Sequence, residues 1–520
     1  MKEVIQNPVK KEVLRRLFPD AVWFGQAPDE FSSVCDDSRH VLPGSIFIAI
    51  VGYETDGHLF AKNALDAGAS LIAVQKNHID RNPKILESVS NAPLLIVSDT
   101  RSAASFVAAE FYDHPSRKIR VHGITGTKGK TTSVHILADI LSYAGLRCGM
   151  IGTLGLEFEG ETVNIGLTTP GPIDFQHLLA MLAASGATDV ACEVSAHAGA
   201  LSRTKSVRFE TVTYLNLSRD HGDHFTPEAY LDAKLAIARD AVKINPDVFG
   251  VANILDPHGV KFLEPILVDK RIAFGVFEEN QNTDKTACDL KVKITGRSSN
   301  GLDFKIITKN PEQAAMLPLL GRFNAENAAA SIAIADAIGI DSDLVVTALE
   351  NVKPVSGRLE KVDLGQDFLV VVDYAHAPKP AEEALSVLRS LTSGRLIAVM
   401  GAGGSRDRGK RPMIGEVLAR MCDLAIITSD NPRKEEPLDI INDILVGVKR
   451  AQDKKAETVV EADRKKAIQT AIKRAHAGDT VAILGKGHET YQIFKDETIH
   501  FDDREIAAEI LKELGWGGVE

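Results

Sequence analysis

The stretch Gly123-Ile124-Thr125-Gly126-Thr127-Lys128-Gly129-Lys130-Thr131-Thr132 decides the fold of the middle of this chain. It follows an apolar run, residues 119–124, that is typical of a buried strand, and it precedes a helical pattern over residues 131–144. Glycines let successive backbone N–H groups point inward in such a turn, and the N-terminus of the next helix adds partial positive charge. The stretch therefore predicts a strand, a phosphate-binding loop and a helix.

Two side chains give this loop its chemistry. Lys130 is long enough to reach the β- and γ-phosphates of a nucleotide, and the Thr131 hydroxyl is a suitable ligand for Mg²⁺. The spacing from Gly123 to Thr131 is one residue wider than GxxxxGKT, but residues 126–131 retain the essential groups. The predicted ATP contacts in the loop are Gly126, Thr127, Lys128, Gly129, Lys130, Thr131 and Thr132. The loop alone leaves a kinase, an ATPase motor and a ligase open.

Outside the loop, short apolar runs alternate with amphipathic stretches over nearly the whole chain. This alternation is the signature of α/β layering around parallel sheets. The predicted strands are residues 45–51, 70–75, 94–98, 119–124, 368–374, 395–400, 424–428 and 480–484. Predicted helices include residues 131–144, 173–184, 327–338 and 437–449.

Composition excludes several classes of protein. A formal net charge of −11 argues against a nucleic-acid binder, because a phosphate backbone requires a basic surface. The N-terminus lacks an apolar signal region and no run of 18 apolar residues occurs, so we expect neither secretion nor a membrane partner. The five cysteines are scattered without CxxC spacing, which indicates no zinc site and no disulfide framework. We therefore expect a cytoplasmic protein.

Length and local breaks in the pattern predict three domains. A chain of 520 residues is too long for one compact core. The pattern is interrupted at residues 114–118, ahead of the phosphate loop, and again at the Pro/Gly/Ser-containing residues 352–357. We place the domains at residues 1–99, 100–352 and 353–520.

Several further segments, in this order along the chain, resemble the Mur ligase family. After the phosphate loop they are Glu193-Val194-Ser195-Ala196-His197, Asn216-Leu217-Ser218-Arg219-Asp220-His221, Asp232-Ala233-Lys234, Gly321-Arg322-Phe323-Asn324-Ala325-Glu326-Asn327, Ser356-Gly357-Arg358-Leu359-Glu360 and Val372-Asp373-Tyr374-Ala375-His376. The chain departs from the family pattern at Ala196, where a second serine is usual, and around Gly199 and Leu201. The resemblance nevertheless extends over almost the entire chain.

The resemblance implies a fold and a reaction. It implies a central P-loop ATPase-like parallel sheet, flanked by an N-terminal α/β domain for a nucleotide sugar and a C-terminal Rossmann-like domain. The implied reaction activates a carboxylate as an acyl phosphate with ATP and Mg²⁺, and then couples it to an amine. Later segments most resemble members that add the third residue of the peptidoglycan stem peptide. The implied partners are UDP-N-acetylmuramoyl-L-alanyl-D-glutamate and a free diamino acid, and we expect a monomer.

Site residues carry over from the family by position. Lys130, Glu193, His221 and Lys234 match the catalytic set, with Thr131, Glu193, His221 and a carbamylated Lys234 as metal ligands. Asn324, Asn327, Arg358 and Asp373 match ATP contacts. The residues that match the family's contacts to the nucleotide-sugar peptide are Ser38, Tyr53, Glu54, Thr55, Thr168, Thr169, Ser195 and Arg203. Read alone, Asn324 is equally a helix cap, Lys234 a surface lysine, and Arg358 or Asp373 a member of an ion pair.

The segment Asp430-Asn431-Pro432-Arg433 predicts the amino acid that is added. It resembles the segment of family members that select meso-diaminopimelate, whose distal carboxylate a guanidinium can bind through two hydrogen bonds. Arg433 and Arg406 are available for carboxylates, and Glu489 together with the Gly485 carbonyl for the distal ammonium. L-Lysine lacks the distal carboxylate and would leave an arginine unpaired.

Three alternatives remain at this point. The chain could add L-lysine, or be another amide ligase of the superfamily with a folate or polyamide acceptor. It could be a P-loop kinase or mechanical ATPase, which needs no amine. It could also be a relative that only binds precursors, although Lys130, Thr131, Glu193 and His221 are all present.

Overall fold

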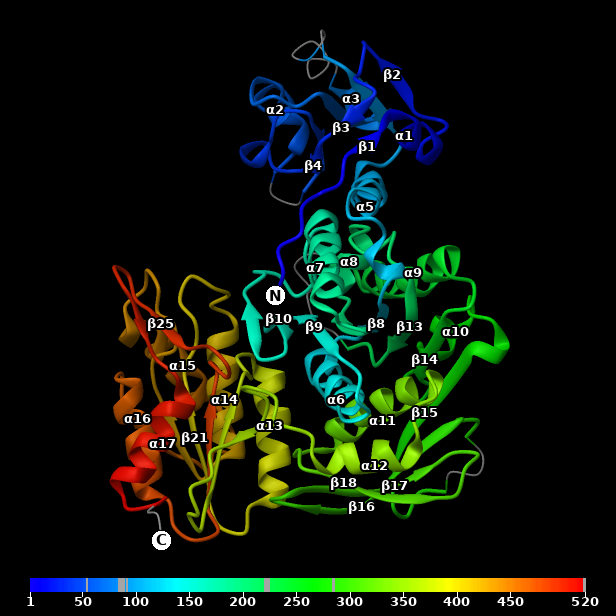
Figure 1. The fold of residues 1–520 in the computed structure, drawn as a ribbon. Coiled ribbons are helices and arrows are strands. Elements are labelled where there is room, and N and C mark those ends of the chain that lie inside the picture. Colours follow the sequence, from blue (N-terminus) through cyan, green and yellow to red (C-terminus); the bar gives the residue numbers. More distant parts are fainter. Residues whose placement is uncertain (53–54, 83–88, 90–91, 219–224, 283–285, 518–520) are drawn as a thin grey trace. The chain divides into compact units, whose positions relative to one another are not determined.

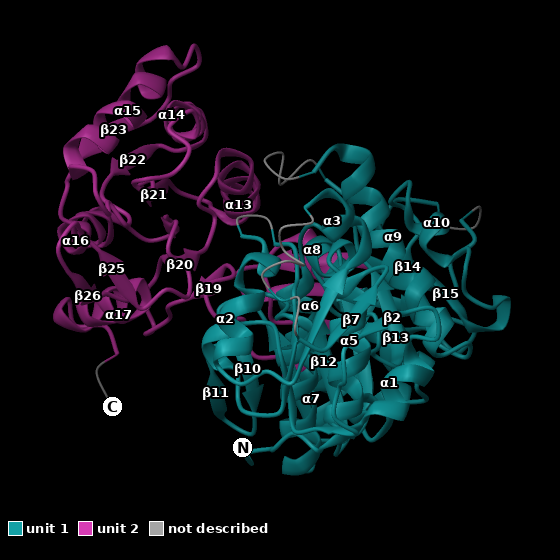
Figure 2. Cartoon of the chain, turned by 90° about the horizontal axis from the view of Figure 1, so that it is seen from above, with its two compact units in different colours: residues 1–293, 305–315, 326–349 teal, residues 294–304, 316–325, 350–520 magenta. Residues whose placement is uncertain are grey.

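The computed structural model describes residues 1–52, 55–82, 89, 92–218, 225–282 and 286–517 (Figure 1). Contacts divide the chain into two compact units, coloured separately in Figure 2. Unit 1 contains residues 1–293, 305–315 and 326–349, and unit 2 contains residues 294–304, 316–325 and 350–520. Tyr53, Glu54 and His221, three of the predicted site residues, lie outside the described residues.

The first sheet of unit 1 has five strands in the order β2-β7-β6-β5-β4. Strands β4 to β7 are parallel, and β2 is antiparallel to β7. Residues in β5, β6 and β7 are almost all buried, as expected of parallel strands covered on both faces. The strands are β2 Val22–Phe24, β4 Ser33–Cys35, β5 Ser45–Ile48, β6 Leu71–Gln75 and β7 Leu94–Val97, and the short β1 Val9–Lys10 pairs with β3 Glu30–Phe31.

The second sheet of unit 1 carries the phosphate loop. Its order is β11-β10-β9-β12-β8-β13-β14-β15, and the strands from β9 to β15 run parallel while β10 and β11 are antiparallel. Strand β12 lies between β9 and β8, and every one of its residues is buried. The strands are β8 Arg120–Thr125, β9 Cys148–Gly152, β10 Gly155–Phe158, β11 Glu161–Val163, β12 Asp189–Glu193, β13 Phe209–Tyr214, β14 Phe249–Asn253 and β15 Arg271–Glu278.

Helices of unit 1 cover these sheets with apolar side chains. Thr226 caps α9 by accepting a hydrogen bond from the Ala229 N–H, and Pro227 occupies the first helical position, where no N–H is needed. The helices are α1 Lys11–Leu17, α2 Ala61–Asp66, α3 Lys76–Arg81, α5 Thr100–Phe111, α6 Lys130–Tyr143, α7 Pro172–Ser185, α8 Ala196–Ala200, α9 Pro227–Ile244 and α10 Gly259–Leu263. Short 3-10 helices occupy Ser38–His40, Gly57–Phe60, Pro115–Arg117 and Val268–Lys270. Among the helices that the structure describes, none combines the length and the apolar character needed to cross a bilayer.

Five elements have residues in both units. They are β16 Leu290–Ser298, β17 Gly301–Ile307, β18 Gln313–Leu317, α11 Arg322–Ala337 and α12 Ser342–Glu350.

Unit 2 is a doubly wound α/β layer structure. Its sheet has the order β19-β20-β24-β21-β22-β23, in which the strands from β20 onward are parallel. Side chains of α13, α14 and α15 form the core on one face, and side chains of α16 and α17 form the core on the other. The elements are β19 Glu360–Lys361, β20 Leu369–Asp373, α13 Pro378–Leu391, β21 Leu396–Met400, α14 Lys410–Met421, β22 Leu424–Ile427, α15 Pro437–Arg450, β23 Glu457–Val460, α16 Arg464–Arg474, β24 Thr480–Leu484, β25 Tyr491–Ile493, β26 Thr498–His500 and α17 Asp503–Glu513.

A buried ion pair connects two strand ends of unit 2. The Arg464 guanidinium donates to Asp503 at 2.8 and 2.7 Å, and both side chains have 0% exposure. Its other N–H groups donate to the carbonyls of Ser429, after β22, and Leu484, the last residue of β24. Arg464 therefore holds together the two strand ends from which residues 430–433 and 485–489 continue.

The predicted α/β class is confirmed, and each predicted strand overlaps an observed parallel strand. The functional segments follow the carboxyl ends of parallel strands, which is the edge where ligands bind in such sheets. The phosphate loop follows β8, Glu193 ends β12, and residues 430–433 follow β22. The three-domain boundaries at residues 99 and 352 stay a prediction.

Breaking the Arg464–Asp503 pair is expected to destabilise unit 2 strongly. In an Asp503→Ala protein the guanidinium stays buried without its carboxylate, so the free energy of unfolding should fall by about 3–5 kcal/mol. Chemical denaturation measures this change. A Glu457→Ala protein is a control, since Glu457 and its partner Arg474 are both exposed and the loss should be smaller. Equal losses would contradict the role assigned to Arg464.

Candidate functional site

The phosphate loop is held open by an asparagine from the neighbouring strand. The side-chain oxygen of Asn216, just after β13, accepts hydrogen bonds from the backbone N–H groups of Thr127 at 3.1 Å and Lys128 at 3.0 Å. Its amide nitrogen donates to the Lys128 carbonyl. The Lys130 ammonium donates to the carbonyls of Gly126 and Thr127 at 3.0 and 3.2 Å. Lys130 therefore lies over the loop, where an anion bound by the loop would meet it.

Glu193 is a buried carboxylate beside this loop. Its Oε1 accepts hydrogen bonds from the Thr131 hydroxyl at 2.9 Å and from the Thr153 N–H at 2.8 Å, and its side chain is 1% exposed. A Cβ on Gly152 would lie 2.4 Å from the same oxygen, so only glycine fits there. Among the described residues, all hydrogen-bond partners of this carboxylate are neutral donors. A buried carboxylate and a hydroxyl without a compensating cation are the oxygen ligands that suit Mg²⁺.

The predicted contacts to the sugar peptide form a network with the same residue. The Thr169 hydroxyl donates to the Glu193 carbonyl at 2.8 Å and accepts from the Ser195 N–H at 3.1 Å. Arg203 Nη1 donates to the Thr169 carbonyl at 2.5 Å. Thr168 and Thr153 share a hydroxyl–hydroxyl hydrogen bond of 3.1 Å. These four predicted residues lie together around the carboxyl end of β12.

Lys234 is not a surface lysine. Its side chain on α9 has 0% exposure, and its ammonium lies 4.6 Å from the centre of the Tyr230 ring. Tyr230, one helical turn earlier, places its hydroxyl 3.4 Å from the Thr127 hydroxyl. Lys234 is therefore connected through one aromatic side chain to the phosphate loop.

The two predicted adenine-side asparagines have different surroundings. Asn327 lies against the phosphate loop, because a Cβ on Gly129 would be 2.1 Å from its side-chain oxygen. Gly129 has a positive φ of 88°, so both the space and the backbone require glycine there. Asn324 donates from its side chain to the Leu320 carbonyl at 2.8 Å, within its own turn.

In the first sheet, the predicted uridine-diphosphate segment follows β4. Ser38 begins a 3-10 helix that Asp37 caps by accepting from the Arg39 N–H. A Cβ on Gly171 would lie 4.0 Å from an Asp36 carboxylate oxygen, so this segment adjoins the residues after Thr168 and Thr169. The Thr55 carbonyl accepts a hydrogen bond from the Gly52 N–H at 2.8 Å.

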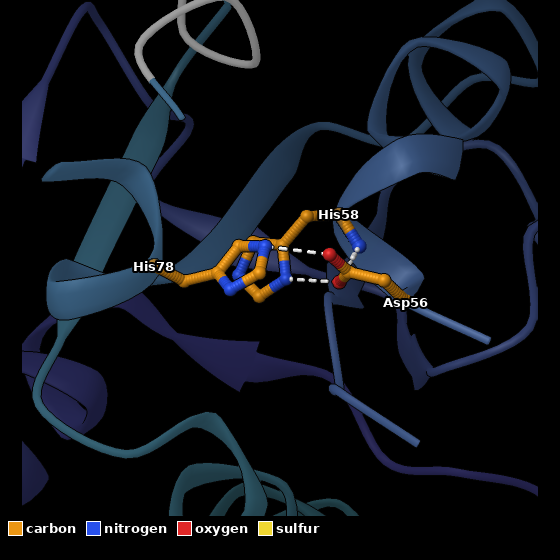
Figure 3. Close-up of side chains that lie close together, drawn as sticks. All are labelled: Asp56, His58 and His78. Carbon is orange, nitrogen blue, oxygen red and sulfur yellow. Dashed lines mark hydrogen bonds and ion pairs between the residues drawn. The ribbon is translucent and has the colours of Figure 1, made fainter. Parts of the chain in front are cut away.

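A carboxylate and two imidazoles lie together in unit 1, at Asp56, His58 and His78 (Figure 3). Asp56 accepts from His58 Nδ1 at 2.8 Å and lies 2.5 Å from His78 Nε2, and the two rings stack with centroids 4.4 Å apart. Burial lowers the pKa of His58, and His58 Nε2 accepts a hydrogen bond from the Gln75 N–H at 3.0 Å. The neutral ring therefore carries its proton on Nδ1 and has no lone pair left for a metal ion. We assign this cluster a structural role.

In unit 2, residues 430–433 adopt a strained conformation. Arg433 has φ of 53°, a left-handed value that is uncommon for a residue with a side chain. Its N–H donates to the Ile493 carbonyl, and its Nη1 donates to the Gly404 carbonyl at 3.0 Å. A Cβ on Gly403 would lie 2.9 Å from Arg433 Nη1 and 3.6 Å from Arg406 Cγ. Side-chain atoms of both predicted carboxylate-binding arginines therefore lie beside Gly403.

The predicted ammonium site lies next to these residues. Asn431 donates from its side chain to Glu489 Oε2 at 2.8 Å. A Cβ on Gly485 would lie 2.6 Å from an Asp430 carboxylate oxygen, so Asp430 adjoins the carbonyl predicted for the ammonium. Pro432 continues this segment, and its carbonyl would meet a Cβ on Gly404 at 1.8 Å.

Arg358 and Asp373 adjoin the same strand ends. Asp373, the last residue of β20, accepts hydrogen bonds from the N–H groups of Leu359 and Ala375, both at 2.8 Å. Burial raises the pKa of Asp373, while the nearby Arg358 acts in the opposite direction. Arg358 also lies 5.3 Å from the Tyr374 ring centre, and the Gly485 N–H donates to the Asp373 carbonyl. The predicted ATP contacts of unit 2 therefore border its predicted amino-acid site.

The structure thus gathers the predicted residues into two groups, one in each unit. Sequence reasoning missed Asn216 and Thr153, which hold the loop and Glu193, and it missed the cluster of Asp56, His58 and His78. Asn216 stood in a segment already recognised by resemblance, but its contacts join residues almost 90 positions apart. No local pattern reports such a contact.

Comparison with known proteins agrees with this arrangement. Three family models match successive parts of the chain: "Mur ligase family, catalytic domain" over residues 30–112, "Mur ligase middle domain" over 124–335, and "Mur ligase, glutamate ligase domain" over 357–487. The chain is 38% identical over 489 residues to a UDP-N-acetylmuramoyl-L-alanyl-D-glutamate--2,6-diaminopimelate ligase of Syntrophomonas wolfei, which covers 94% of this chain and 96% of that protein. A protein of the same name from Clostridium botulinum is 39% identical, with 93% and 96% covered. A solved structure carrying this name matches with a TM-score of 0.68 at 30% identity, covering 93% of this chain and 95% of the other.

Removing the side chain of Asn216 is expected to weaken nucleotide binding. In an Asn216→Ala protein the Lys128 N–H loses its side-chain acceptor, and the hydrogen bonds that hold the loop to residue 216 are lost. The Kd for ATP should therefore rise about tenfold. Titration calorimetry measures this affinity. Asn253→Ala is the matched control, because Asn253 ends the next strand and bonds to the Leu255 N–H instead. An unchanged Kd in the Asn216 variant would show that these hydrogen bonds are not needed for nucleotide binding.

Proposed function

Because this chain belongs to the Mur ligase family, we propose that it is an ATP-dependent ligase that joins 2,6-diaminopimelate to UDP-N-acetylmuramoyl-L-alanyl-D-glutamate. The observation that carries the proposal is that Glu193 belongs to two groups of residues at once. Its carboxylate accepts from Thr131 of the phosphate loop, and its carbonyl accepts from Thr169, a residue expected on the acceptor side. A phosphate donor and a carboxylate acceptor bound to these groups would meet at the end of β12.

The reaction has two steps. An oxygen of the glutamate carboxylate attacks the γ-phosphorus of ATP, ADP leaves, and an acyl phosphate forms. The amine of the diamino acid then attacks the activated carbonyl, inorganic phosphate leaves, and the amine gives up a proton as the amide forms. Lys130 and the N–H groups of the loop bind the phosphates through the first step. Ser195, Thr169 and Arg203 orient the sugar peptide.

Magnesium ions would screen the repulsion between the phosphates and the attacking carboxylate. Thr131 and Glu193 have the oxygen ligands and the burial for one ion. His221 and a carbamylated Lys234 are proposed for a second. The carbamate would arise when the Lys234 ammonium first gives up one proton and the neutral amine then attacks carbon dioxide and releases a second, so that a buried cation becomes an anion.

We propose that residues at the strand ends of unit 2 select the diamino acid. Arg433 and Arg406 have side-chain atoms beside Gly403 and would bind the distal carboxylate, with residues 430–432 shaping the pocket. Glu489 and the Gly485 carbonyl would accept from the distal ammonium. Arg358, Asp373, Asn324 and Asn327 are each proposed to contact ATP. Ser38, Tyr53, Glu54, Thr55 and Thr168 are proposed to bind the nucleotide sugar.

An ADP-release assay tests the reaction. Wild-type protein should release ADP only when the nucleotide-sugar dipeptide and meso-diaminopimelate are both present. Lys130→Ala should reduce turnover at least 1000-fold and leave the unfolding temperature nearly unchanged, since its ammonium donates to carbonyls of the loop itself, at Gly126 and Thr127. ADP release without the amine would point to a kinase or ATPase instead.

Arg433 is expected to decide the choice of amino acid. Arg433→Gln should lower kcat/KM for meso-diaminopimelate about 10- to 100-fold and leave the weak reaction with L-lysine nearly unchanged, because only the former has a distal carboxylate. Competition between the two amino acids measures the preference. Arg474→Gln, on the outer end of α16, is the control. A wild-type preference for L-lysine would end this part of the proposal.

A further inference from the structure

Lys486 is a fully buried lysine that the reaction above does not use. It follows β24, between Gly485 and Gly487, and its side chain has 0% exposure. Lysine is rarely buried to this extent without partners, because removing an ammonium from water costs several kcal/mol. Its three N–H bonds have three acceptors: Asn431 Oδ1 at 3.3 Å, Glu489 Oε2 at 3.3 Å, and the Tyr491 carbonyl. An ammonium has no further donor, so Lys486 cannot bind a substrate without breaking one of these bonds.

The ammonium fixes the orientation of Asn431. The side-chain oxygen of Asn431 accepts from Lys486 and also from the Ile493 N–H at 3.0 Å. With two donors on the oxygen, the amide nitrogen must point the other way, where it donates to Glu489 Oε2 at 2.8 Å. Lys486 therefore determines which end of Asn431 faces Glu489.

The Lys486 ammonium binds one carboxylate oxygen of Glu489, and the second oxygen stays available as an acceptor. Oε2 receives hydrogen bonds from both Asn431 and Lys486. Within the described part of the chain no hydrogen bond reaches Oε1, and the side chain is 16% exposed. Glu489 thus presents one acceptor oxygen at a defined position. The buried cation also offsets the charge of Glu489, with which it forms an ion pair of 3.3 Å.

We propose that Lys486 is a positioning residue that fixes Glu489 and Asn431 so that the free Glu489 oxygen receives the side-chain ammonium of the incoming diamino acid. The inference rests on the proposed function and extends it to a residue that touches no substrate. Its effect is confined to the amino-acid substrate, since none of its three partners belongs to the phosphate loop or to the sugar-peptide network.

The test compares Lys486→Met with wild type in the ADP-release assay, varying each substrate in turn. Methionine is unbranched and only one atom shorter than lysine, and it removes the donors. The KM for the diamino acid should rise about 10- to 100-fold, while the KM values for ATP and for the nucleotide-sugar dipeptide stay within about threefold. Lys465→Met is the matched control, because Lys465 pairs with Glu509 at the surface and should change none of the three.

A double-variant cycle separates positioning from a general effect on folding. If Lys486 acts through Glu489, then Lys486→Met should add little to the loss already caused by Glu489→Gln. Additive losses, an unchanged KM for the diamino acid, or equal rises in all three KM values would overturn the inference. Should Lys486→Met fail to fold, Lys486→Gln, which retains two N–H donors, takes its place with the same expectations. A wild-type protein that couples no diamino acid would overturn the proposed function itself, and the inference with it.

Discussion

The arrangement around the phosphate loop of unit 1 depends on one buried group, the carboxylate of Glu193. It ends the central strand β12, so neighbouring strands on both sides fix its position. Glycine at position 152 leaves room for it, and Thr131 and Thr153 hold it by neutral hydrogen bonds. A carboxylate is stable in a protein interior only when its oxygens accept hydrogen bonds and a cation offsets its charge. The phosphate loop and the acceptor residues are both arranged around that requirement.

The second unit buries basic side chains and pairs them with acceptors. Arg464 forms an ion pair with Asp503, and its other N–H groups donate to the carbonyls of Ser429 and Leu484 at the ends of two strands. Lys486 lies beneath the loops that continue from these strands. Parallel sheets place loops from distant parts of the chain at one edge, but they do not fix how those loops face each other. In this unit, buried arginine and lysine side chains supply the cross-connections.

The sequence alone predicted the strands, the phosphate loop and the α/β class, because each depends on local periodicity and on the backbone freedom of glycine. Resemblance supplied Thr169, Ser195 and Arg203, which the structure brings together around Glu193. Asn216, Thr153 and Lys486 were not predicted as site residues. Their roles arise from hydrogen bonds between segments 40 to 90 residues apart, which composition and spacing do not encode. Lys234 illustrates the limit, since helical spacing by itself could not show that this lysine is buried.

The left-handed backbone at Arg433 has a consequence for any effort to make this protein more heat-resistant. A glycine there would relieve an estimated 1–2 kcal/mol of local strain, offset in part by the greater freedom of glycine in the unfolded chain. Selection for heat resistance alone would therefore favour loss of the guanidinium. Under the role proposed for Arg433, only simultaneous selection for discrimination between amino acids would retain it. Laboratory evolution of this scaffold thus requires both pressures at once.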